Sequence, residues 1–182
     1  MEQAKFQSGY IVVVKKTLKL GVCLSLNIIM RNNARAIVVK NDFLLVMLRN
    51  KFGERYYTLV GGGIEDDEDV NDAVIREVRE ESSLKIEPIR EIAFGYYAAG
   101  EKTTFIWCHY VSGEPILDGS SEEAADNLKG ENTYQPMWIK WDDLMSSEMP
   151  FYPDAPEIKG LIRILIEGGE LPKEPVEVRF TN

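Results

Sequence analysis

The chain has 182 residues, enough for one compact domain with a short appendage, and its 45% apolar and 28% charged residues are typical of a globular protein. Its 30 acidic and 21 basic residues give a net charge of −9, which argues against a protein that mainly grips nucleic-acid backbones. Two cysteines and a single histidine are too few for a disulfide framework, a four-thiolate zinc site or a site built on two histidines. Carboxylates must therefore carry most of any chemistry.

Residues 1–29 differ from the rest, with four lysines against one glutamate. The lysines interrupt the apolar residues, unlike a secretory signal, and the eleven residues from Leu20 to Met30 are too few to span a membrane. We interpret this segment as an N-terminal extension, either an appended strand pair or a partner-contacting arm, which leaves a homodimer open. The domain itself is expected over residues 30–182. Cys23 and Cys108 are expected to be reduced, which fits a cytoplasmic protein without membrane contact.

From residue 34 onward, apolar stretches alternate with turns and amphipathic segments. Apolar and β-branched stretches predict strands at 36–40, 43–49, 56–60, 86–97, 103–111 and 135–140. Amphipathic periodicity predicts two helices, one at 70–82 with Asp69 as its N-cap and one at 154–167. Residues 41–42 are predicted to form a hairpin turn, and residues 112–132 a polar loop. This order indicates an α/β fold, in which helices flank a mixed sheet.

The negative charge is concentrated in residues 65–81, which hold nine acidic and two basic residues. A solvated acidic helix is the simpler explanation, and a site for hard divalent cations is the sharper one. At about 100° per residue, Glu77, Glu80 and Glu81 fall within a wedge of about 100° that borders the buried stripe of the helix. Partly desolvated carboxylates in one wedge repel one another unless a cation neutralises them, so the spacing favours the metal site.

Three consecutive glycines, Gly61 to Gly63, follow the third predicted strand and precede the acidic helix. Glycines let a backbone approach a ligand or metal closely. No Lys-Ser or Lys-Thr pair follows them, so phosphate is expected here only through bridging metal ions. Just before the glycines, Arg49, Lys51 and Arg55 are either contacts for an anionic substrate or exposed loop charges.

The acidic helix and the glycines form one continuous pattern. It runs Gly62, five residues, Glu68, seven residues, and then Arg76-Glu77-Val78-Arg79-Glu80-Glu81-Ser82-Ser83-Leu84. This pattern resembles the box of the Nudix hydrolases. The departure at a specified position is Ser83, where the box has glycine, and it concerns the loop after the helix rather than the chemistry. The resemblance extends from about residue 31 to residue 168 and leaves out residues 1–29.

The resemblance implies an α/β/α sandwich around a mixed β-sheet. It also implies hydrolysis of a small-molecule nucleotide, a nucleoside diphosphate linked to another group, with Mg²⁺ or Mn²⁺ as cofactor. The positions that match metal-site residues of the family are Glu68, Glu77, Glu80, Glu81 and the backbone of Gly62. Glu80 and Glu81 would also serve catalysis, and Arg76 would orient a glutamate.

The general base is left open between a box glutamate and an acid of the loop beyond the box. That loop offers Glu122, Glu123 and Glu131. Glu131 is preferred among them because it lies nearest the strand predicted at 135–140.

The residues after the box bear on the substrate, and the box glutamates bear on whether the chain is catalytic. Signatures of the ADP-ribose, diadenosine polyphosphate, NADH and coenzyme A subgroups are absent, which favours a nucleoside triphosphate or another small nucleotide. The alternative function is a catalytically silent Nudix-fold module that binds a nucleotide as a sensor. Loss of box glutamates would favour that alternative, and none is lost.

Overall fold

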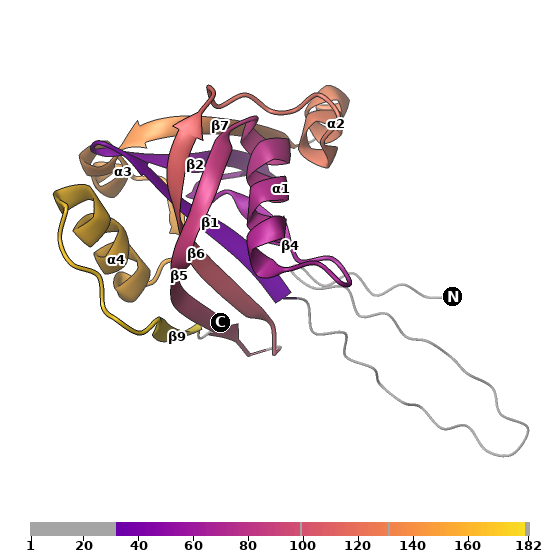
Figure 1. The fold of residues 1–182 in the computed structure, drawn as a ribbon. Coiled ribbons are helices and arrows are strands. Elements are labelled where there is room, and N and C mark those ends of the chain that lie inside the picture. Colours follow the sequence, from indigo (N-terminus) through magenta and orange to yellow (C-terminus); the bar gives the residue numbers. More distant parts are fainter. Residues whose placement is uncertain (1–31, 99, 131, 181–182) are drawn as a thin grey trace, which may run out of the picture.

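The computed structural model describes residues 32–98, 100–130 and 132–180, and within them the chain forms nine strands and four helices (Figure 1). The predicted N-terminal extension and Glu131 lie outside the described residues. The strands are β1 (Asn32–Lys40), β2 (Phe43–Lys51), β3 (Glu54–Thr58), β4 (Gly61–Gly63), β5 (Lys85–Tyr97), β6 (Lys102–Ser112), β7 (Thr133–Lys140), β8 (Phe151–Tyr152) and β9 (Val176–Phe180). The helices are α1 (Val70–Ser82), α2 (Glu122–Lys129), α3 (Trp141–Ser146) and α4 (Pro156–Glu167).

The strands form one mixed sheet. Its path runs β8-β3-β2-β1-β6-β5-β9, with β4 paired to β1 and β7 paired to β2. β1 and β2 form the predicted hairpin, whose turn residue Asn41 has a positive φ of 57°. The pairs β1–β6, β3–β8 and β5–β9 are parallel, whereas β5–β6 and β2–β7 are antiparallel. The mixed sheet predicted from the sequence is confirmed.

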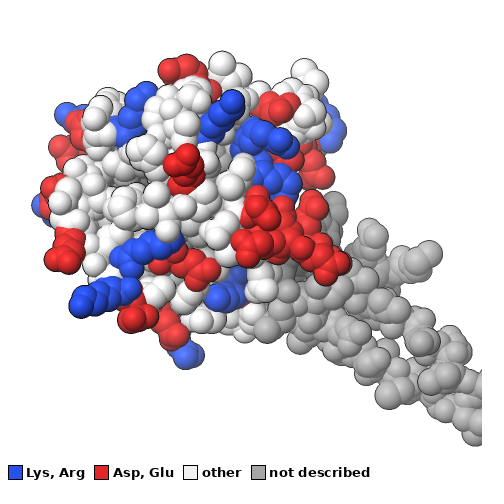
Figure 2. Space-filling view, viewed as in Figure 1, with Lys and Arg blue, Asp and Glu red and all other residues white. Residues whose placement is uncertain are grey.

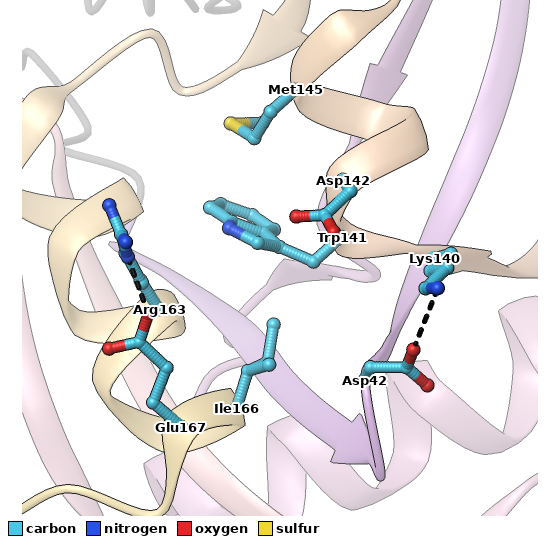
Figure 3. A pocket seen from close by; sticks show the side chains of 8 residues that line it. All are labelled: Asp42, Lys140, Trp141, Asp142, Met145, Arg163, Ile166 and Glu167. Atoms are coloured by element: carbon cyan, nitrogen blue, oxygen red, sulfur yellow. Dashed lines mark hydrogen bonds and ion pairs between the residues drawn. The ribbon is translucent and has the colours of Figure 1, made fainter.

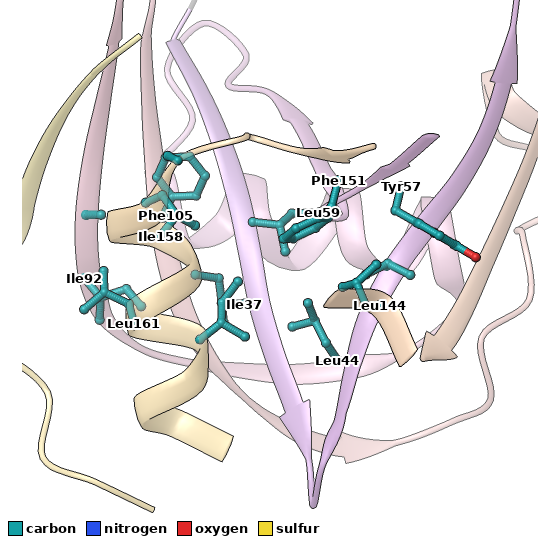
Figure 4. Close-up of a cluster of buried hydrophobic side chains, with 14 of the residues drawn as sticks. Ile37, Leu44, Tyr57, Leu59, Ile92, Phe105, Leu144, Phe151, Ile158 and Leu161 are labelled. Carbon is teal, nitrogen blue, oxygen red and sulfur yellow. The ribbon is translucent and has the colours of Figure 1, made fainter. Parts of the chain in front are cut away.

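Helices cover both faces of this sheet (Figure 1). On one face, α1 buries Val74 and Val78 in a core with side chains of β1, β2 and β6. On the other face, α3 and α4 close a second core in which Leu144 and Ile158 join Phe105 from β6 (Figure 4). Each large apolar side chain buried in this way contributes about 1.5–3 kcal/mol. The first core fixes α1 against one face of the sheet and the second fixes α3 and α4 against the other. The α/β/α arrangement implied by the box is confirmed.

The helix α1 spans the predicted residues, and both of its ends are capped. The Asp69 carboxylate accepts a hydrogen bond from the Asn71 N–H at 2.8 Å. At the other end, Ser83 adopts a left-handed conformation with φ 58°, and its N–H donates to the Arg79 carbonyl at 2.8 Å. Serine therefore ends the helix in the conformation that glycine favours, at a cost of about 1–2 kcal/mol.

The prediction of a loop over residues 112–132 is wrong in part, because Glu122–Lys129 form α2. The Ser121 side chain caps this helix by accepting a hydrogen bond from the Ala124 N–H at 3.1 Å, and Gly130 ends it with φ 74°. Two turns are too short for a clear apolar periodicity, so the cap was the available signal in the sequence.

Smaller differences concern element ends and short elements. β3 and β7 each begin two residues before the prediction, and α4 begins at Pro156, whose fixed φ suits a first helical turn. α3, β8 and β9 escape the sequence patterns because each is short. Within the part of the chain that is described, none of the helices is long and apolar enough to cross a membrane.

Candidate active site

Acidic side chains gather over α1 and the segment that leads into it, with basic ones beside them (Figure 2). Three side chains of α1 each meet one glycine of β4. Arg76 Nη2 donates to the Gly63 carbonyl at 3.0 Å, and the Glu81 carboxylate accepts from the Gly61 N–H at 2.8 Å. The Glu77 carboxylate lies so close to Gly62 that a Cβ on that residue would overlap it. Because the three glycines have no side chains, the side chains of α1 can contact the β4 backbone directly.

Arg76 is the centre of an ion-pair network. Its Nε and Nη2 atoms bond both oxygens of Glu68 at 2.8 Å, a bidentate pair. Its Nη1 atom bonds Glu77 at 2.8 Å and contacts Glu80 at 3.4 Å. One guanidinium thus ties three carboxylates to the β4 backbone. That Arg76 orients a glutamate for catalysis stays a prediction.

These contacts and the burial of the site shift the pKa values of the residues in the network. The hydrogen bond from Arg76 lowers the pKa of Glu68 to about 2, and the bond to Glu68 raises the pKa of Arg76. Burial raises the pKa of Glu77, against the opposing effect of Arg76. Glu68 and Arg76 are therefore a fixed ion pair, while burial works against the charged form of Glu77.

Glu81 is the most buried acid of the wedge, with 2% of its surface exposed. Its Oε1 atom lies 3.0 Å from Arg49 Nη2, and Arg49 in turn lies over the Tyr134 ring at 5.3 Å. Burial raises the pKa of Glu81 to about 7, although Arg49 and Arg35 oppose this shift. For Arg49 the sequence left open a contact to an anionic substrate or an exposed loop charge. Arg49 is half-buried and paired with Glu81, so it is not an exposed loop charge, and the substrate contact stays a prediction.

Arg35 supports the glycine surface from β1. Its Nη1 atom donates to the carbonyls of Leu59 and Gly61. Burial and the neighbouring Arg49 lower the pKa of this guanidinium. Sequence reasoning missed Arg35; the available signal was a charged residue between two alanines at the start of an apolar run.

The donor set fits a divalent cation in its chemistry. Among the described residues, no three Asp, Glu, His or Cys side chains converge as a ready metal cluster. Glu77, Glu80 and Glu81 instead each contact an arginine. Carboxylate oxygens beside a bare backbone at Gly62 are nevertheless the ligands that Mg²⁺ and Mn²⁺ prefer. The chemistry of these residues fits the predicted metal site, which stays a prediction.

The charge of one loop acid acts on the wedge. The segment before α2 is anchored to the end of α1, because the N–H groups of Ile116 and Asp118 donate to the carbonyls of Ser82 and Glu80 at 3.0 and 3.1 Å. α2 then presents Glu123 half-buried, and its charge contributes to the raised pKa of Glu81. Glu122 is exposed, and the preferred Glu131 lies outside the described residues.

A hollow of about 410 Å³ lies apart from this site, between α3, α4 and the β1–β2 turn (Figure 3). Four of its five charged side chains form two ion pairs: Lys140 lies 3.3 Å from Asp42, and Arg163 lies 2.7 Å from Glu167. Its described lining includes none of the box residues, so it is not a candidate for the same chemistry.

A family model described as the NUDIX domain matches residues 30–159 of the chain. The comparison with curated proteins finds no match.

Solved structures share this fold at low sequence identity. An ADP-ribose pyrophosphatase from Streptococcus suis 89-1591 is 21% identical, with a TM-score of 0.57 over 82% of this chain and 98% of that chain. A NUDIX hydrolase from Nitrosomonas europaea has a TM-score of 0.62 at 13% identity, over 99% of this chain and 100% of that chain. A MutT NUDIX hydrolase from Burkholderia pseudomallei is 22% identical, with a TM-score of 0.51 over 75% of this chain and 95% of that chain. At these identities the likeness shows the fold alone.

Proposed function

Because the chain belongs to the Nudix hydrolase family, we propose that it hydrolyses the pyrophosphate linkage of a nucleoside diphosphate derivative. The observation that carries this proposal is the pairing of Arg76, Glu77 and Glu81 with three successive glycines of β4. A merely solvated acidic helix would direct its acids away from the sheet, whereas these are packed against it.

The residues that would hold Mg²⁺ or Mn²⁺ are Glu77, Glu80 and Glu81, with Glu68 and the Gly62 backbone beside them. Such a cation, when bound, polarises phosphate oxygens and makes a bound water more acidic. Arg76 keeps Glu77 and Glu80 in place through its bonds to Glu68 and to the Gly63 carbonyl. Its role is therefore to position the carboxylates.

In the proposed reaction, a water oxygen forms a bond to a phosphorus atom of the linkage. The bond from that phosphorus to the bridging oxygen breaks, and the leaving phosphate keeps the bridging oxygen and its electron pair. The proton of the water passes to a carboxylate of this chain. Glu123 is supported by the effect of its charge on Glu81, Glu131 by its position in the sequence, and a box glutamate is the alternative.

Single Glu→Gln changes at positions 123 and 131 separate these candidates. Loss of a general base lowers kcat by about 10²–10⁴-fold and removes the acidic limb of the pH–rate profile. A change at the exposed Glu122 provides the matched control, with turnover near that of the unaltered chain. If both changes leave kcat and the pH profile intact, the base is a box glutamate.

The absent subgroup signatures favour a nucleoside triphosphate or another small nucleotide. The buried, unpaired thiol of Cys108 fits the cytoplasmic location that we propose.

The test is a panel of nucleoside triphosphates, nucleoside diphosphate sugars and dinucleotides, incubated with Mg²⁺ or Mn²⁺. Released phosphate, pyrophosphate and nucleoside monophosphate are measured. We expect turnover of at least one compound and none when a chelator replaces the metal. Metal-independent nucleotide binding without turnover of any compound would overturn the proposal in favour of a sensor.

A further inference from the structure

Four side chains line up on the α1 face of the sheet next to the carboxylates. In the strand register, Arg49 of β2 stands opposite Tyr134 of β7 on one side and Tyr56 of β3 on the other. Directly opposed residues point to the same face of a sheet. Because Arg49 reaches Glu81, Tyr56 also lies on the face that carries the catalytic wedge.

Tyr152 extends this row by one more strand. It pairs with Thr58 in the parallel β3–β8 register, and Thr58 shares a face with Tyr56 because they are two residues apart. The Tyr56 and Tyr152 rings meet edge to face, with centroids 5.5 Å apart and planes at 81°. Tyr56 is half-buried, whereas Tyr152 is 48% exposed. The two rings therefore hold one another in place, and about half of Tyr152 is open to solvent.

An exposed aromatic side chain held in place by a second one is a surface for stacking. Nucleobases stack on such rings in a sequence-tolerant way, because every base has a π-face. Arg49, one strand away from Tyr56, supplies a positive charge, and its Nε atom is buried with no hydrogen-bond partner among the described residues. A nucleotide with its phosphates near Arg49 and the carboxylates would carry its base toward the two tyrosines.

We propose that Tyr152, braced by Tyr56, is the surface on which the base of the nucleotide stacks. The catalytic part of this inference rests on the proposed function, and the binding part does not. Tyr152 is then a specificity-determining residue, one that separates nucleotides from sugar phosphates and inorganic polyphosphates and tolerates more than one base.

Binding is tested first, because it requires no turnover. Calorimetry compares AMP, GMP, CMP and UMP with ribose 5-phosphate on the full chain, on Tyr152→Ala and on Tyr152→Phe. We expect at least one monophosphate to bind about 10–100-fold more tightly than ribose 5-phosphate, from the worth of one stacked base. Tyr152→Ala removes that difference, and Tyr152→Phe keeps it.

Phe43→Ala is the matched control, because Phe43 is 39% exposed and lies at the β1–β2 turn, at the other end of β2 from Arg49. It should change none of these affinities. The proposal is overturned if all monophosphates bind like ribose 5-phosphate, or if their preference survives in Tyr152→Ala.

Kinetics distinguish this inference from the proposed function. With a nucleotide substrate, Tyr152→Ala raises KM about 10–100-fold with little change in kcat, while inorganic tripolyphosphate is turned over or ignored equally by both proteins. Turnover without this KM effect overturns the stacking surface alone. A base preference that depends on Tyr152, in a chain that turns over nothing, overturns the hydrolase alone.

Discussion

Glu81 and Arg49 form an ion pair between α1 and β2, with Arg49 Nη2 3.0 Å from Glu81 Oε1 and only 16% and 3% of the two side chains exposed. The second oxygen of Glu81 accepts the Gly61 N–H at 2.8 Å. The box helix, the glycine run and the neighbouring strand thus share one buried carboxylate. That carboxylate is stable as an anion only while its partners stay in place.

Replacing Arg49 by methionine should therefore destabilise the fold strongly. The change leaves the buried Glu81 charge without its cation, which costs about 3–5 kcal/mol for a pair of this kind. Urea unfolding at pH 8 measures the loss, with Arg55→Met as the control, because Arg55 is exposed and forms no ion pair among the described residues. Equal stability of the two variants at pH 8 would contradict the pairing.

The raised pKa of Glu81 predicts that the stability of the metal-free protein depends on pH. Its ordinary pKa of 4.5 applies to the unfolded chain and the value of about 7 to the folded one, so the folded chain binds more protons between these values. Stability then falls as pH rises from about 4.5 to 7, by up to about 3 kcal/mol. Melting curves with a chelator across this range test the slope, and Glu81→Gln should flatten it.

Gly61 and Gly62 should respond differently to alanine. At Gly62 the new Cβ meets the flexible carboxylate of Glu77, which can move aside, so we expect a stability loss of about 1 kcal/mol or less with most activity gone. At Gly61 the Cβ meets the backbone of Ala34 and φ is +135°, so that variant should lose several kcal/mol. Melting temperature and turnover of both variants decide this. A fully active Gly62→Ala protein would show that Glu77 is not needed where it lies.

At Ser83 a substitution should raise the stability of the fold. It has φ 58° at the end of α1, so Ser83→Gly relieves left-handed strain and should stabilise the chain by about 1 kcal/mol. For a chain of this length the melting temperature rises by about 2–4 °C. Ser147→Gly is the control, because Ser147 ends α3 with φ −67° and its hydroxyl accepts from the Met149 N–H, so that variant should be less stable. A lower melting temperature for Ser83→Gly would show that the serine side chain stabilises the turn.

The sequence predicted the parts of this molecule that depend on local periodicity. The helix from Val70 to Ser82 and its Asp69 cap follow from side-chain spacing, and so does the wedge that borders the buried stripe. The partners of that wedge do not follow from spacing, because Arg35 and Arg49 approach it only through the pairing of distant strands.

The same limit applies to the loop beyond the box. α2 is two turns long, and the anchoring of residues 116–118 to the end of α1 is a tertiary contact that no local pattern encodes. Distance along the sequence from a strand led to Glu131, which lies outside the described residues, whereas the charge of Glu123 acts on Glu81 through the fold. Long-range placement therefore decides which loop acid acts on the buried carboxylate.

Glu80→Gln should remove most activity and leave the fold almost unchanged. Glu80 is the most exposed member of the wedge, at 37%, and its contact with Arg76 is a long 3.4 Å. Its charge also opposes ionisation of Glu77, so the loss of a weak contact is offset by relief of repulsion. Without metal, the two proteins should differ in stability by about 0.5 kcal/mol or less.

With Mg²⁺ the same change removes an anionic ligand, so metal affinity and transition-state stabilisation should fall by several kcal/mol. Turnover then drops by orders of magnitude, at about 1.4 kcal/mol per factor of ten. The test measures melting temperature with and without Mg²⁺, and turnover at saturating Mg²⁺, for the unaltered chain, Glu80→Gln and Asp72→Asn. Asp72→Asn is the control, because it removes an exposed acid from the first turn of the same helix. Asp72→Asn should keep both turnover and the Mg²⁺-dependent rise in melting temperature. Unchanged turnover in Glu80→Gln, with no response of melting to Mg²⁺ in any of the proteins, would end the metal-site interpretation.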